Sequence, residues 1–121
     1  MKLKTSELTG VFLDWAVHVA LHGECEGYPE YEYSTDWAQG GPIIEREVIS
    51  LDYALCYGET GQEWEAVSVD DLKLGGPTPL IAAMRCYVAS KLGDEVDVPD
   101  ELIEMFIVPL RGVTNYIGET K

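Results

Sequence analysis

The helical signal of the chain is clearest at residues 75–93, which read GGPTPLIAAMRCYVASKLG. After the glycine–proline break at Gly75–Pro79, apolar residues recur at steps of three and four, which places them on one stripe of a helix. This stripe consists of Ile81, Met84, Val88 and Leu92. Proline favours the first turn of a helix and glycine its end, so we expect a helix from Leu80 to about Leu92 that Gly93 ends.

A β-hairpin is predicted before this break. Residues 49–57 alternate between apolar and polar side chains, which is the period of a half-buried strand. Residues 58–61, GETG, have the composition of a turn, and residues 63–69 contain Trp64, Val67 and Val69 in a second, weaker alternation. Upstream, Gly40-Gly41-Pro42 opens the segment Ile43–Glu47, which we expect to be a short helix.

The first element is expected to be a helix from Thr5 or Ser6 to about Leu21. Its apolar residues share one face, with the spacing Leu8, Val11, Phe12, Trp15, Ala16, Val19 and Ala20. Thr5 or Ser6 would cap its first amides, and Gly23 would end it.

The element order predicts an α+β fold in which a small antiparallel, hairpin-based sheet packs against two long helices. The layers would form either a two-layer arrangement or an α–β–α sandwich. At 121 residues the chain is expected to be one domain, residues 1–121, with a core over about residues 5–98 and a C-terminal extension over residues 99–121. Residues 94–99 would form an acidic linker and residues 100–106 a further short helix.

The composition is strongly acidic, with 8 lysines and arginines against 22 aspartates and glutamates, a formal net charge of −14. Such a surface repels free duplex DNA and anionic membranes, and it suits a basic protein, a cation or mimicry of nucleic acid. Solubility alone also explains the charge. From these residues we expect neither a signal peptide nor a membrane-spanning segment. The widely spaced Cys25, Cys56 and Cys86 indicate free thiols in a reducing cytoplasm.

Several long blocks of the sequence resemble the NinX-like family of small proteins from tailed phages and prophages. The blocks are TSEL at residues 5–8, LDWAV at 13–17, YSTDWAQGGPIIERE at 33–47 and PTPLIAAMRCYVASKLGDEV at 77–96. The resemblance covers the chain to about Val98 and implies a phage protein in the cytoplasm of an infected bacterium. It also implies likeness to phage domains described as α–β–α sandwiches. The family carries no established activity, so no catalytic residues are transferred.

The two glycine–proline breaks are the first candidate site. A glycine turn before a helix exposes backbone amides that hold anions, and a nearby arginine adds charge. The candidate ligand-binding residues are Ser34, Thr35, Asp36, Trp37, Gly40, Gly41 and Arg46 at the first break, and Thr78 and Arg85 at the second. The alternative is purely structural: two capped helix starts, with Trp37 in the core. Neither break has the Walker spacing.

Two further candidates lie before residue 38. The segment Tyr28–Trp37, which we call the tyrosine–acid loop, interleaves acidic residues with the interface candidates Tyr28, Tyr31 and Tyr33. The loop would bind a basic or aromatic partner, or act as a lid over the core. His18 and His22, with Asp14 one turn earlier, share a helix stripe and are weak candidates for metal binding. Their alternative is a solvated polar face.

Three functions are compatible with these residues. The first is a non-enzymatic phage accessory module that occupies a host or phage protein, such as a host-defence factor, or sequesters a small anionic ligand. The second is an acidic interaction protein that mimics DNA or holds a basic partner. The third is a hydrolase that uses Asp36 or the histidine pair with a metal. No nucleophile motif is present and no cofactor is expected. A homo-oligomer would cover the open face of a small sheet.

Overall fold

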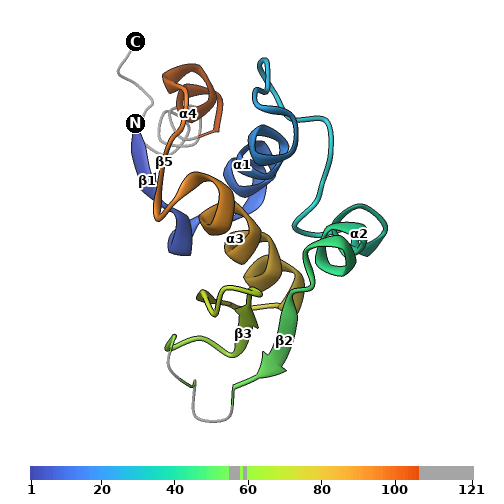
Figure 1. Ribbon diagram of the computed structural model, residues 1–121. Helices are drawn as coiled ribbons and strands as arrows, with labels where there is room; N and C mark the ends of the chain where they lie inside the picture. The colour runs from blue at the N-terminus through green and yellow to red at the C-terminus, as the bar shows by residue number, and fades with distance from the viewer. Residues whose placement is uncertain (55–57, 59, 107–121) are drawn as a thin grey trace.

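The computed structural model describes residues 1–54, 58 and 60–106. The helices in this part are α1 (Gly10–His22), α2 (Trp37–Glu47), α3 (Pro79–Leu92) and α4 (Asp100–Phe106), with a 3-10 turn η1 (Thr5–Glu7) (Figure 1). The strands are β1 (Lys2–Lys4), β2 (Ser50–Tyr53), β3 (Trp64–Val67), β4 (Lys73–Gly76) and β5 (Glu95–Asp97). The expected end of the first hairpin strand at residues 55–57, including Cys56, lies outside the described residues, as do residues 107–121 of the expected extension.

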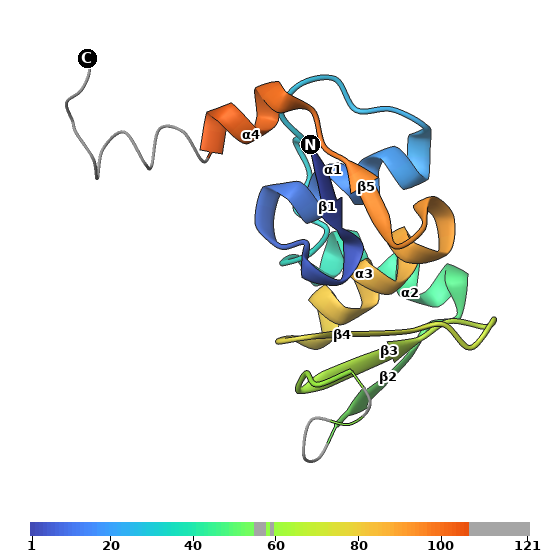
Figure 2. The ribbon, with the colours of Figure 1, turned by 90° about the vertical axis from the view of Figure 1, so that its left-hand side faces the viewer.

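Helix α3 is the central element of the fold and begins and ends as its sequence predicts. The Thr78 side chain accepts a hydrogen bond from the Ile81 amide at 3.1 Å, and Pro79 occupies the first turn. At the other end, the Gly93 amide donates to the Ala89 carbonyl. Between these caps α3 packs on all three strands of the larger sheet and on both α1 and α2. Figure 2 shows this sheet on one side of α3 and α1 on the other, so α1 packs against α3 and not directly on the sheet.

The predicted hairpin is confirmed, and a third strand extends it. Strands β2 and β3 pair antiparallel with Tyr53 opposite Trp64, and β3 pairs antiparallel with β4. Residues 75–76 were expected to form a break, yet they end β4. A Cβ at Gly76 would lie 2.7 Å from the Ala82 amide nitrogen, so glycine lets this strand lie directly against α3.

The first strand pairs with the last strand of the described chain, an arrangement that no local sequence pattern predicts. Strand β1 pairs antiparallel with β5, in the segment expected to be a linker. The helix expected from Thr5 or Ser6 begins later, at Gly10, because η1 and an extended Thr9 precede it. The Thr5 hydroxyl donates to the Gly93 carbonyl at 2.7 Å and therefore caps no helix. Gly23 does end α1, in the left-handed conformation with φ of 89°.

Helix α2 is longer than expected, because it runs continuously through Gly40, Gly41 and Pro42. Asp36 caps it, and its carboxylate accepts from the Ala38 amide at 3.0 Å. Pro42 lacks the N–H that would bond the Ala38 carbonyl, so the helix continues with one backbone hydrogen bond missing. The prediction of a short helix that begins only after the glycines is therefore wrong about where the helix begins.

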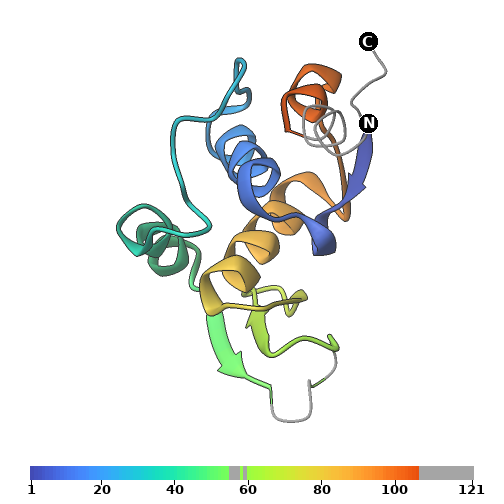
Figure 3. The same cartoon turned by 180° about the vertical axis from the view of Figure 1, so that it is seen from behind.

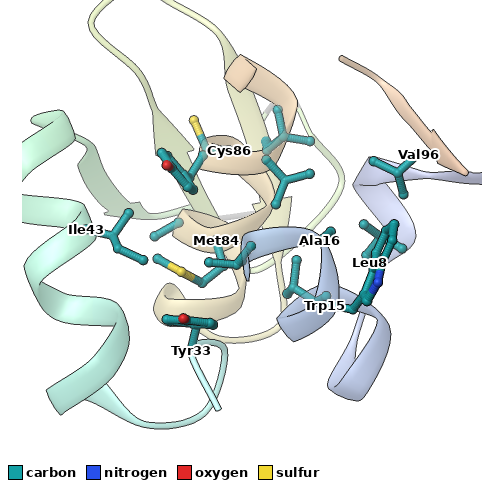
Figure 4. Packing of buried hydrophobic residues seen from close by; sticks show 14 of the residues in the cluster. Leu8, Trp15, Ala16, Tyr33, Ile43, Met84, Cys86 and Val96 are labelled. Atoms are coloured by element: carbon teal, nitrogen blue, oxygen red, sulfur yellow. The ribbon is translucent and has the colours of Figure 1, made fainter. Parts of the chain in front are cut away.

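One hydrophobic cluster joins these elements and confirms the α+β class, with small antiparallel sheets packed against helices. Figure 4 shows side chains from α1, α2 and α3 that meet at Met84, which is fully buried. The same cluster includes Leu102 and Ile103 of α4, so the core extends past residue 98. Cys25 and Cys86 are free thiols, as expected. Burial raises the pKa of Cys86 to about 11, which makes its thiol unreactive.

Candidate binding surface

The tyrosine–acid loop lies along α1, so the loop and the histidine stripe form one surface. Figure 3 shows the chain running from the end of α1 along one side of the molecule to α2. Hydrogen-bonding groups hold it there: the Ser34 amide donates to Asp14 Oδ1 at 2.9 Å, and the Tyr33 hydroxyl lies 3.1 Å from His18 Nδ1. Two sites that the sequence presented separately are therefore adjacent in space.

Aromatic rings make up much of this contact. The His18 ring stacks on Tyr31 with a centroid distance of 5.8 Å and an interplanar angle of 12°. His22 lies 4.5 Å from His18, and Tyr33 lies 5.6 Å from Tyr31, ring centre to ring centre. Tyr33 is buried at 6% exposure, whereas Tyr31 is 49% exposed and Tyr28 54% exposed. Tyr33 thus belongs to the hydrophobic core, whereas Tyr28 and Tyr31 are about half exposed to solvent.

A hollow of about 340 Å³ lies between this part of the loop and the start of α1. We call it the acidic hollow. It is lined by Gly10, Val11, Asp14, Tyr28, Pro29, Glu30, Tyr31, Glu32 and Thr35. Three of these residues are carboxylates and two are half-exposed tyrosines, while none carries a positive charge. The hollow therefore suits a cationic group that also has a flat or apolar surface.

Asp14 is the least exposed of the three carboxylates, at 7%. Burial raises the pKa of its carboxyl group; the hydrogen bond from the Ser34 amide opposes this rise, and the charge of Glu32 adds to it. A buried carboxylate with another carboxylate nearby is stabilised when a cation approaches. The electrostatics of Asp14 consequently favour a positively charged ligand.

The two arginines of the predicted anion site are already engaged by other groups of the protein. Arg85 is 4% exposed, and its guanidinium donates to the Leu8 carbonyl at 2.8 Å and to the Gly75 carbonyl at 2.9 Å. Arg46 is exposed at the end of α2 and pairs with Glu47 at 3.0 Å. Gly40 and Gly41 lie within α2 and form no turn. Arg85 therefore reaches Gly75 of the second break but donates there to a carbonyl oxygen, while Arg46 lies at the end of α2 beside Glu47.

Other residues of that predicted site do come together. Ser34, Thr35, Trp37 and Thr78 line a shallow hollow of about 220 Å³ with Leu80 and Ile81, between the starts of α2 and α3. The capping amides are engaged within their own helices, Ala38 with Asp36 and Ile81 with Thr78. Trp37 is 51% exposed, so it does not fill the core as the structural alternative supposed. This hollow is mainly apolar and contains no basic side chain.

The histidine pair lacks the partners that a metal centre needs. In residues 1–54, 58 and 60–106 no group of three histidine, cysteine, aspartate or glutamate side chains is arranged to hold a metal ion. His18 Nδ1 instead contacts the Tyr33 hydroxyl. Burial lowers the pKa of His18, and the neighbouring charge of His22 lowers it further. The pair is thus part of the contact between α1 and the loop.

The sequence pattern predicted an acidic loop with interface tyrosines that binds a basic partner, but it singled out none of the three acids that line the hollow. Asp14 was considered only with the histidines, and Glu30 and Glu32 only as part of the loop composition. The available signal was the alternation of residues 28–32, YPEYE, which places tyrosines and glutamates next to each other. What that signal could not show is that Asp14, some fifteen residues earlier, completes the hollow.

These observations define a small α+β domain with an acidic, tyrosine-lined hollow on its helical side. A family model described as Bacteriophage P22, NinX matches residues 4–91. The chain therefore belongs to this family of phage proteins, which confirms the resemblance seen in the sequence. The match spans η1 to the last turn of α3 and so includes the whole acidic hollow. No curated protein matches the chain. Within the described residues, no helix is long and apolar enough to cross a membrane.

Proposed function

We propose that this protein is a phage accessory binding protein that holds a basic segment of a protein partner against the acidic hollow. The observation that carries the proposal is the convergence of Asp14, Glu30 and Glu32 with two half-exposed tyrosines on one 340 Å³ hollow. Tyrosine is enriched in protein interfaces, and complementary charge guides a partner to its site. We propose the cytoplasm of the infected bacterium as the place of action.

The positions of the arginines favour this function over the sequestration of an anion. Arg85 is buried among backbone carbonyls and Arg46 is paired with Glu47, so neither is placed to neutralise a bound anion. A net charge of −14 also repels anionic ligands and free duplex DNA. The same charge attracts a lysine- and arginine-rich segment, such as the nucleic-acid-binding face of another protein.

A titration with a short lysine- and arginine-rich peptide tests the proposal. Because the attraction is between exposed charges, we expect measurable binding at about 50 mM salt that is largely lost at about 500 mM. In the double variant Glu30→Gln, Glu32→Gln the dissociation constant should rise about threefold to tenfold, since each exposed ion pair contributes only a modest free energy. Isothermal titration calorimetry measures both effects.

The matched control is Glu95→Gln, Glu104→Gln, which removes two exposed carboxylates from β5 and α4. It changes the net charge equally but leaves the hollow intact, so the dissociation constant should change less than in the hollow variant. Equal weakening in both variants would show that only total charge matters. Absence of binding at low salt would refute the proposed function itself.

A further inference from the structure

We propose that the acidic hollow is a pocket for one arginine side chain of the partner. This inference rests on the proposed function and specifies the group that enters the site.

The ring of Tyr31, the aromatic side of the hollow, is held in place by neighbouring rings. The ring of Tyr31 is stacked on His18 and lies beside Tyr33, whose hydroxyl contacts the same histidine. Because Tyr31 nevertheless remains 49% exposed, its outward surface is available to a ligand. A guanidinium plane binds well against such a ring, since both stacking and cation–π attraction contribute. The Tyr31 ring is therefore preorganised in the unbound protein, which lowers the conformational entropy lost on binding.

The three carboxylates of the hollow differ in exposure. Asp14 is nearly buried and is oriented by the Ser34 amide, which bonds to its Oδ1 atom. Glu30 and Glu32 are exposed on the loop. A guanidinium has five N–H donors in a plane and can bond one carboxylate while it lies near others. An ammonium group has no plane to place against the tyrosine ring, so lysine would use only the charge.

The size of the hollow fits a single side chain. Its volume of about 340 Å³ is at the small end of the range for small-molecule sites, which extends from about 300 to about 1,000 Å³. Pro29 is a buried residue of the tyrosine–acid loop and lines the hollow, which provides an apolar surface for the methylene groups of an arginine. We therefore expect one arginine to be inserted while neighbouring basic residues stay at the rim.

Three peptides of identical length and flanking sequence test this inference on the full chain. Each has one central position, occupied by arginine, lysine or the neutral isostere citrulline, between neutral residues. We expect the arginine peptide to bind about tenfold more tightly than the lysine peptide and the citrulline peptide to show no binding. In NMR titrations of the wild-type protein, amide shifts should be confined to residues 10–14 and 28–35, the segments that line the hollow.

Two variants provide the matched comparison. Tyr31→Ala should remove the preference for arginine over lysine, because it removes the exposed ring. Tyr53→Ala removes a ring that is 58% exposed on β2, outside the hollow, and should leave the preference unchanged. The NMR map needs no variant, so it decides the location even if Tyr31→Ala does not fold.

The outcomes separate this inference from the proposed function. Equal affinities for the arginine and lysine peptides, or amide shifts located away from the hollow, would overturn the arginine pocket and leave the acidic binding function intact. A basic peptide rich in both residues that fails to bind at low salt would overturn both.

Discussion

Gly40 and Gly41 are neighbours in α2, yet only Gly40 lies against another element. A Cβ at Gly40 would collide with the Tyr33 carbonyl oxygen and lie 2.7 Å from Leu80 Cδ1, whereas a Cβ at Gly41 would meet only Trp37 Cε3, at 3.9 Å. Gly40 therefore lets α2, α3 and the tyrosine–acid loop meet closely. Gly41 has no such role and simply lowers the helical propensity.

These two glycines lead to opposite expectations for the same substitution. Gly40→Ala should destabilise the protein by about 1–3 kcal/mol, because the new methyl group forces the backbone of Tyr33 and the side chain of Leu80 to shift. Gly41→Ala should stabilise it by about 0.5–1 kcal/mol, since alanine is the better helix former and the site is open. Urea unfolding measures both changes. Equal effects of the two substitutions would contradict the packing argument.

At the scale of elements, the tyrosine–acid loop depends on α1 for its position. The His18 ring is its central contact, because it stacks on Tyr31 and reaches the Tyr33 hydroxyl. Glu30 is the charged group of the loop that raises the pKa of His18, against the larger lowering effects of burial and of His22. The neutral form of His18 is thus the one that fits between helix and loop.

The lowered pKa of His18 predicts how folding depends on pH. The folded protein binds fewer protons at His18 than the unfolded chain does, so this group's contribution to stability is fully present above its ordinary pKa of 6.5. That contribution is lost as the pH falls from this value through the lower folded-state pKa. NMR titration of the imidazole resonances should give a pKa for His18 below the ordinary value. His22→Gln should move it upward by removing a like charge.

A His18 pKa at or above its ordinary value in the folded protein would refute the prediction that burial and His22 lower it. So would a His22→Gln variant in which the pKa of His18 falls.

At the scale of the whole molecule, Arg85 joins parts of the chain that are far apart in sequence. From the middle of α3 its guanidinium bonds to the Leu8 carbonyl before α1 and to the Gly75 carbonyl in β4. It is 4% exposed, and burial lowers the pKa of its guanidinium. The side chain thus satisfies two backbone carbonyls within the core.

The stability of two arginine variants checks this structural role. Arg85→Met should destabilise the protein by about 2–4 kcal/mol, because it leaves two carbonyls without their donor. Arg46→Met, at an exposed residue paired with Glu47, should change stability by less than about 0.5 kcal/mol. Thermal and urea unfolding of both variants give the comparison. Similar losses in the two variants would show that the bonds of Arg85 contribute little.

How far the sequence predicts this protein depends on whether the signal is local. The periodicity of residues 80–92, the alternation on either side of residues 58–61 and the caps Thr78, Gly93 and Gly23 each lie within a few residues, so α3, the hairpin and the ends of two helices were predictable. The three-residue strands β1 and β5 have no such period, because they form only by pairing with each other. The third strand, β4, was not predicted, because its two glycines are typical of a break between elements.

By itself, the sequence determined the α+β class, the main helix and hairpin, the acidic character and the phage family, because propensity, charge and motif are properties of residues close together in the chain. Only the tertiary structure decided that Arg85 bonds to backbone carbonyls in the core and that Asp14 lines one hollow with Glu30 and Glu32. Those relations depend on how α1, the tyrosine–acid loop and α3 pack. Packing between segments distant in sequence follows from shape and burial, which no local pattern records.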